Sequence, residues 1–276
     1  MLRPIIAILL LLSGAAFGQD SGLERLDRHE DVRSWAAVGR LDISGGGFCT
    51  GALIETDLVL TAAHCIVNGE TGKPRDPARF VFRAGYHDGK SVADRRVIHS
   101  VAHPSYSYFD EDGTRRVRND VALLRLASPI STSVAAPFAV ADRAVGDKVS
   151  VVSYARGRAQ ALSWQRECGV RGTGGGIAAF SCDVDFGSSG APVFDLSRRR
   201  AQIVSIISSG NRSGQSVTAY GPQITEPVRI LKEALRTANG VNAAGGGAVS
   251  NVPTTSGARF VKLGDKNKTG ARFVKP

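Results

Sequence analysis

The chain has 276 residues, of which 42% are hydrophobic and 22% charged. This balance excludes a wholly disordered protein and leaves enough apolar material for one domain of about 200–250 residues. The 32 glycines follow no Gly-X-Y repeat, so a collagen-like structure is also excluded. The formal net charge of +10 is compatible with nucleic acid as a partner, but this depends on where the charge lies in the chain.

Residues 1–18 have the features of a secretory signal peptide. Their apolar stretch, Ile5–Leu12, is far shorter than the roughly 20 residues that a membrane-spanning helix needs, so a membrane anchor is the weaker alternative. Ala16-Phe17-Gly18 places small residues at the two positions that signal peptidase reads, which predicts cleavage before Gln19. We expect a secreted or periplasmic protein, with residues 19–34 as a short segment ahead of its domain.

The middle of the chain predicts short strands separated by turns. Turn signals include Asn68-Gly69, Asp112-Gly113 and Ser209-Gly210-Asn211. Strands at this density, without alternating long helices, favour an all-β sandwich or barrel. The apolar and β-branched runs that we interpret as strands are Gly51–Ile54, Asp57–Thr61, Arg79–Arg83, Val121–Leu126, Asp147–Val152 and Gln202–Ile207.

One helix is predicted near the end of the domain, over Thr225–Ala238. Val228, Leu231 and Leu235 fall on one face of it, at spacings of three and four residues. Asn239-Gly240 is a typical helix stop.

Residues 240–276 differ in character from the rest. The hexapeptide Gly-Ala-Arg-Phe-Val-Lys occurs at 257–262 and again at 270–275, and the segment carries six basic residues against one acid. Because this tail holds much of the net charge, the folded body is only mildly basic and a nucleic-acid partner is not expected. Disorder without a specific role is the favoured interpretation of the tail. Attachment to an acidic surface, or docking into the protein's own cleft, are the alternatives.

Four cysteines in an exported protein predict two disulfides. Their spacings of 16 and 14 residues favour two local loops, which pair Cys49 with Cys65 and Cys168 with Cys182. A zinc site is the alternative, and it is disfavoured because no CxxC or HxxxH spacing is present.

Three residues, in chain order, carry the chemistry that we expect. His64 follows an apolar strand, Asp120 precedes another, and Ser189 lies in a turn rich in Gly and Ser. Each alone has an ordinary structural explanation, but together they are what nucleophilic acyl transfer needs. His64 would be the base that activates the Ser189 hydroxyl, and Asp120 would orient the imidazole and stabilise its charged form. The backbone N–H groups of Gly187 and Ser189 would bind the oxyanion.

These motifs resemble those of chymotrypsin/trypsin-like serine endopeptidases. Thr61-Ala-Ala-His64-Cys65 is similar to the histidine motif of that family, His103-Pro-Ser-Tyr106 to the segment ahead of the aspartate, and Gly187-Ser-Ser-Gly-Ala-Pro192 to the serine motif. The resemblance implies an all-β fold of two six-stranded antiparallel β-barrels with a C-terminal helix, over a protease domain at residues 35–239. It also implies protein or peptide substrates, no metal or other cofactor, and a monomer.

Two departures from the family pattern concern the serine loop. Ser188 stands where digestive relatives carry an aspartate that pairs with a freshly cut amino terminus. We therefore predict that this protein is not activated by proteolytic release of a new N-terminus. Asp183 lies six residues before Ser189, the family offset for an aspartate that binds Arg or Lys, but the neighbouring Cys182 indicates a differently built loop. By resemblance, Ser208, Ser209 and Gly210 are further candidates for substrate binding.

A charged insert, Asp110–Arg116, lies between the His64 and Asp120 motifs, and we interpret it as a solvated surface loop. A calcium site is the alternative, which the two arginines of the insert disfavour. The competing functional classes are a catalytically silent homologue that acts as a binding module, and an esterase. The common esterase fold would need the order Ser, Asp, His and a Gly-x-Ser-x-Gly elbow, and this chain has neither.

Overall fold

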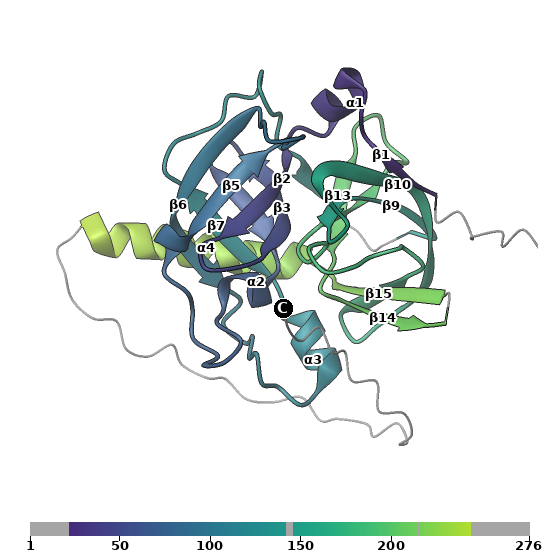
Figure 1. Cartoon of the computed structure of the whole chain (residues 1–276). Coiled ribbons are helices and arrows are strands. Elements are labelled where there is room, and N and C mark those ends of the chain that lie inside the picture. The colour runs from purple at the N-terminus through teal and green to yellow at the C-terminus, as the bar shows by residue number, and fades with distance from the viewer. Residues whose placement is uncertain (1–21, 142–145, 215, 244–276) are drawn as a thin grey trace, which may run out of the picture.

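The computed structural model of the chain describes residues 22–141, 146–214 and 216–243. Two β-rich halves lie side by side, and a long C-terminal helix runs along the first of them (Figure 1). The predicted signal peptide and almost all of the basic tail lie outside the described residues, so both stay predictions.

The first half is a closed six-stranded barrel in which neighbouring strands are antiparallel, in the order β2-β3-β4-β7-β6-β5. Its interior is filled by large side chains with essentially no exposure, such as Leu53, Leu60, Phe82 and Leu123. Burial on this scale drives closure, because each apolar side chain removed from water contributes about 1.5–3 kcal/mol. The strands are β2 (Val38–Ile43), β3 (Phe48–Glu55), β4 (Leu58–Thr61), β5 (Phe80–Ala84), β6 (Ala93–Ala102) and β7 (Ala122–Leu126).

The second half is a nine-stranded sheet with the order β14-β15-β11-β10-β9-β12-β13-β8, and β1 pairs with β10. The sheet curls back on itself, since Ser205 Oγ on β13 donates to the Pro222 carbonyl on β15 over 2.7 Å. We call this curled sheet the second barrel, although only the first half is closed by strand pairing and the second has nine strands rather than the expected six. The strands are β1 (Leu23–Arg25), β8 (Ala139–Val140), β9 (Lys148–Ala155), β10 (Arg158–Gly174), β11 (Ile177–Phe180), β12 (Pro192–Asp195), β13 (Gln202–Ile206), β14 (Ser209–Ser213) and β15 (Ser216–Pro222).

Four α-helices and one 3₁₀ turn complete the described part of the chain. The last helix confirms the predicted face, because Val228, Leu231 and Leu235 are all buried. The predicted stop at Asn239-Gly240 is wrong: the helix runs through it, at a propensity cost of only about 1 kcal/mol for the glycine. The elements are α1 (His29–Ser34), α2 (Ala63–Ile66), η1 (Pro77–Arg79), α3 (Gly113–Arg118) and α4 (Thr225–Ala243).

Two other local expectations are corrected. The insert at Asp110–Arg116 is not all loop, because Asp112 caps α3 by accepting from the backbone N–H groups of Thr114 and Arg115. Ser209-Gly210-Asn211 is not a turn but the first part of β14, paired with β15, where the ladder hydrogen bonds override the turn preference of Gly and Asn.

The two halves meet through a cluster of aromatic rings. Trp35 packs against Phe138, Trp164 and Phe194, with ring centroids 5.8, 5.1 and 4.9 Å apart. Tyr154 in the second half also donates its hydroxyl to the Tyr86 carbonyl in the first, over 2.8 Å. This joint core fixes the orientation of the barrels, and with it the positions of the loops that face each other between them.

Both predicted disulfides are confirmed. Cys49 is bonded to Cys65, and Cys168 to Cys182. The first bridge fastens α2 to β3 directly beside His64, and the second fastens β10 to the segment that leads to Ser189. Of the helices in the described ranges, none is long and apolar enough to cross a membrane.

Candidate active site

The three predicted catalytic residues come from three separate elements. His64 is on the short helix α2, Asp120 lies between α3 and β7, and Ser189 precedes β12. Two of these elements belong to the first barrel and one to the second, so the candidate site lies where the two halves meet.

His64 and Asp120 form a doubly bonded pair. Their side chains are joined by a 2.7 Å hydrogen bond between His64 Nδ1 and Asp120 Oδ2, while the backbone N–H of His64 donates to Asp120 Oδ1 over 2.8 Å. Asp120 is only 2% exposed, so its charge has little access to water and depends on these partners. A carboxylate bound to Nδ1 leaves Nε2 as the nitrogen that can accept a proton.

A third group completes the carboxylate's environment. Ser208 Oγ, which follows β13 in the second half, donates to Asp120 Oδ2 over 2.6 Å. The sequence placed Ser208 among the substrate-binding candidates, whereas its side chain is committed to Asp120. Charge-assisted hydrogen bonds of this kind are roughly twice as strong as neutral ones, so the carboxylate is held in one orientation.

The Asp120 carboxylate also tunes the basicity of His64. Burial lowers the pKa of the imidazole, but the charge of Asp120 and its hydrogen bond together outweigh this effect, and Arg116 opposes them only weakly. The net result is a pKa raised above the ordinary value of 6.5. The imidazole is thereby made a stronger base.

Close packing holds the loop of Ser189 against the first barrel. Thr50 N donates to the Ser189 carbonyl and Thr50 Oγ1 to the Gly187 carbonyl, each over 2.8 Å. Gly190 approaches so closely that a Cβ there would lie 2.1 Å from Thr61 Oγ1 and 2.4 Å from the Thr50 carbonyl. Only glycine fits at position 190. This close contact lies near His64, because Thr61 precedes His64 by three residues.

Two backbone N–H groups of the serine loop have no hydrogen-bond partner among the described residues. Neither the Gly187 N–H nor the Ser189 N–H donates to a group within the described part of the chain. Gly187 has φ +95°, a conformation that other residues rarely adopt, and this turns the chain between the two amides. Among the same described residues, Ser189 Oγ forms no hydrogen bond with His64, a contact that often tightens only when substrate is bound.

The candidate specificity residue Asp183 is already paired. Arg212 Nη2, on β14, donates to Asp183 Oδ1 over 3.0 Å, and the Asp183 N–H donates to the Gln165 side chain over 2.8 Å. A carboxylate neutralised in this way attracts a substrate arginine or lysine less strongly. The other substrate-binding candidates, Ser209 and Gly210, lie on β14 next to this pair.

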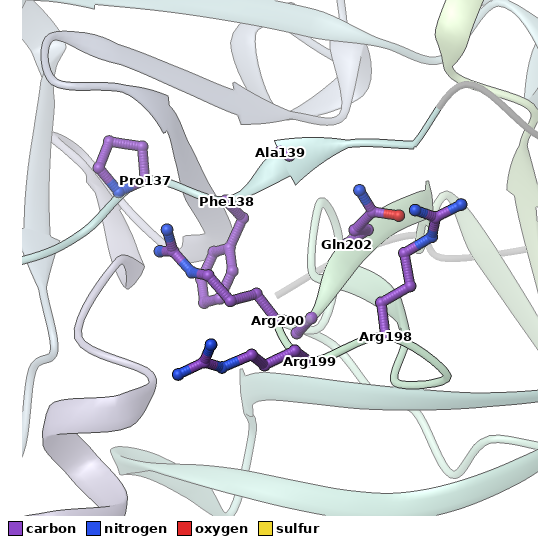
Figure 2. Close-up of a pocket in the computed structure, with 8 residues that line it drawn as sticks. Pro137, Phe138, Ala139, Arg198, Arg199, Arg200 and Gln202 are labelled. Carbon is purple, nitrogen blue, oxygen red and sulfur yellow. The ribbon is translucent and has the colours of Figure 1, made fainter.

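Among the residues that the structure describes, one group of potential metal ligands is present, formed by Cys49, His64 and Cys65. Both cysteines are tied up in the disulfide and cannot coordinate an ion, so the zinc alternative is not supported at this place. A cavity of about 550 Å³ lies away from the catalytic candidates, beside β8 and the turn ahead of β13 (Figure 2). It is lined by Pro137–Ala139 and Arg198–Gln202, none of which the sequence singled out.

The fold and this constellation define a class, the chymotrypsin-like proteases with two β-barrels. The family model described as "Trypsin-like peptidase domain" matches residues 49–201, more than half of the chain, and spans all three catalytic candidates. The chain therefore belongs to the trypsin-like peptidase family.

Individual relatives are distant. Serine protease 56 of Homo sapiens is 32% identical over 98 residues, which are 36% of this chain and 15% of that protein. Trypsin theta of Drosophila erecta is 28% identical over 143 residues, 46% of this chain and 48% of that protein. The chain thus spans less than half the length of either. A solved structure of a Glu endopeptidase in complex with MPD superimposes with a TM-score of 0.63 at 19% identity, covering 80% of this chain and 98% of the other.

Proposed function

We propose that the protein is an exported serine endopeptidase that cleaves peptide bonds through an acyl-enzyme intermediate, with Ser189 as nucleophile, His64 as general base and Asp120 as the orienting carboxylate. The observation that carries this proposal is the bonding of Asp120 Oδ2 to both His64 Nδ1 and Ser208 Oγ, beside a serine loop clamped by Thr50. Export is supported by the two disulfides, which persist in oxidising compartments.

In the proposed acylation step, Ser189 Oγ attacks the substrate carbonyl carbon while its proton passes to His64 Nε2. Asp120 holds the opposite side of the ring and stabilises the imidazolium. The negative oxygen of the tetrahedral intermediate accepts hydrogen bonds from the free N–H groups of Gly187 and Ser189. As the peptide C–N bond breaks, His64 returns its proton to the departing amine and leaves an ester on Ser189.

Deacylation follows the same path with water in place of the amine. His64 removes a proton from water, the resulting hydroxide attacks the ester carbon, and the oxyanion again binds to the two amides. Collapse of that intermediate breaks the bond to Ser189 Oγ, which regains a proton from His64. The protein ends in its starting state, with the peptide cut into an acid and an amine.

A fluorescent fluorophosphonate probe tests the proposal, because its phosphorus reacts covalently with an activated serine. Wild-type protein should be labelled and Ser189→Ala should not. Ser213→Ala, which removes an exposed serine at the end of β14, is the matched control and should be labelled like wild type. Equal labelling of wild type and Ser189→Ala, or no labelling of folded wild type, would contradict the proposed triad and favour a silent binding module.

A further inference from the structure

Arg158, an arginine of the second barrel, contacts the loop that carries Ser189. Arg158 begins β10, and its guanidinium donates to the Ser153 carbonyl over 2.9 Å and to Ser153 Oγ over 3.1 Å. The same guanidinium donates through Nη2 to Ser188 Oγ over 3.2 Å. Ser188 is the residue directly before Ser189, so Arg158 acts one position away from the proposed nucleophile.

Ser188 has no exposed surface, and its hydroxyl is surrounded by partners. Besides Arg158, the Asp185 N–H lies 3.4 Å away as a donor, while Ser153 Oγ and the Tyr154 carbonyl lie 3.4 Å away as acceptors. A buried hydroxyl bonded on all sides has one available orientation. The side chain of Ser188 therefore fixes the rotation of its own backbone.

That backbone controls the proposed oxyanion site. The peptide that joins Ser188 to Ser189 carries the Ser189 N–H, and the Gly187 N–H lies two residues earlier. If the Ser188 side chain turned away, the plane of the following peptide would turn with it. Donors in such a site must point at the developing charge, and displacements on the order of 1 Å cost about 100-fold in rate.

The charges around Arg158 fit a holding role. Asp183 and Asp185, both on the loop that leads to Ser189, attract the guanidinium. Burial lowers the pKa of Arg158, yet a guanidinium keeps its charge under all physiological conditions. A permanently charged group with five fixed donors is suited to holding this loop, and among the described residues Arg158 is the one cation that bonds to the Ser188 side chain.

We propose that Arg158 is a positioning residue that orders the oxyanion loop through Ser188, in place of the cut amino terminus used by relatives with an aspartate before the nucleophile. The proposal rests on the proposed function, because it concerns the loop of Ser189. It makes the enzyme active as folded, since the ordering cation is part of the chain's interior from the start.

The test compares Arg158→Met with Arg156→Met. Both substitutions remove an arginine from the same turn. Arg156 is exposed and contacts Asp185, over 3.4 Å, and the Phe186 ring, 4.5 Å from its centroid, but it bonds to neither Ser153 nor Ser188. The measurements are the maximal labelling rate and the half-saturating concentration of a fluorophosphonate probe, together with the melting temperature. Arg158→Met should lower the maximal rate by about 100-fold without changing the half-saturating concentration, because the oxyanion bonds form in the transition state. Arg156→Met should match wild type.

A wild-type labelling rate in folded Arg158→Met would overturn the inference, even if the melting temperature fell. Should that variant not fold, Ser188→Ala answers the same question, because it deletes only the hydroxyl that Arg158 bonds. A wild-type rate in Ser188→Ala would then overturn the inference. Where both variants fold, their losses should not multiply in the double variant, since they remove one shared interaction; independent, multiplying losses would also contradict the proposal.

Blocking the amino terminus tests whether a free terminus, rather than Arg158, orders the loop. A short peptide extension before residue 19 should leave the labelling rate unchanged, whereas loss of labelling would show that a free terminus orders the loop. The two proposals fail separately: unlabelled wild type removes the proposed function, while labelled wild type with an equally labelled Arg158→Met removes only the role of Arg158.

Discussion

Ser208 Oγ lies 2.6 Å from Asp120 Oδ2, although 88 residues separate the two in the chain. The serine follows β13 in the second half and the aspartate precedes β7 in the first. The bond therefore joins the two barrels at the carboxylate that also holds His64. His64, the proposed general base, is thus oriented by both halves of the molecule rather than by its own barrel alone.

Ser208→Ala should slow fluorophosphonate labelling about tenfold. The substitution removes a hydrogen bond to a buried carboxylate, and such bonds contribute about 1.5–3 kcal/mol, part of which water can replace. The matched control is Ser209→Ala, because Ser209 is equally buried and its hydroxyl has no partner among the described residues. A Ser208→Ala rate equal to that of wild type would show that Ser208 does not support the aspartate.

The imidazole of His64 should titrate above pH 6.5, and that of His103 below it. Asp120 raises the pKa of His64, whereas burial and the charge of Arg118 lower that of His103. NMR titration of both rings in Ser189→Ala tests this, and adding Asp120→Asn should lower the pKa of His64 while leaving that of His103 in place. A His64 value at or below that of His103 would refute the expectation.

The raised pKa of His64 also makes the stability of the fold depend on pH. Because the pKa of folded His64 lies above its unfolded value, its protonated form stabilises the fold below pH 6.5, and this contribution is lost as the pH rises through the folded pKa. Labelling, which needs the neutral base, should rise over that same interval.

Arg212→Ala should improve cleavage after arginine and lysine about tenfold. The substitution frees the Asp183 carboxylate from its 3.0 Å partner, and one charge-assisted hydrogen bond accounts for a change of that size. A library of quenched fluorescent peptides measures the preference. Arg171→Ala is the control, since Arg171 bonds to Thr218 and Ser216 instead. No gain in Arg212→Ala would mean that Asp183 does not face the substrate.

The two disulfides should contribute alike to stability and differently to activity. Their separations of 16 and 14 residues each correspond to about 3 kcal/mol of loop-closure entropy, so both double Cys→Ala variants should lose that much in urea unfolding. Only removal of the Cys49–Cys65 bridge should slow labelling of the folded protein, because Cys65 directly follows His64. Equal labelling of the two folded variants would be evidence against this assignment.

Local patterns in the sequence were enough to predict much of the fold. The strand runs, the apolar face of α4 and both disulfides depend on spacings of a few to sixteen residues, which the chain displays directly. Helix α3 was missed although its signal was present, because Asp112 is a good N-cap that we assigned to a turn. The error came from weighing the following glycine over the cap.

The contacts that refine the site could not be predicted. Thr50 holds the serine loop across 137 residues of sequence, and Arg158 reaches Ser188 across 30. The chain has 35 basic residues, and nothing local distinguishes the partly buried Arg158, or Arg212 with its ion pair to Asp183 at the surface, from the others. Which arginine turns inward is decided by the packing of the two barrels, which brings together segments that have no periodic relationship.

The contacts of Thr50 also bear on the stage of synthesis and folding at which the proposed active site is completed. A chain grows from its amino terminus, so the barrel that holds His64 and Asp120 is synthesised before Ser189 exists. Until the second barrel docks, the N–H and hydroxyl of Thr50 have no loop to hold, and the serine has no base beside it. If the proposed triad carries the activity, a nascent or half-folded chain is therefore expected to lack it, and the activity should arise only when the second half docks on the first.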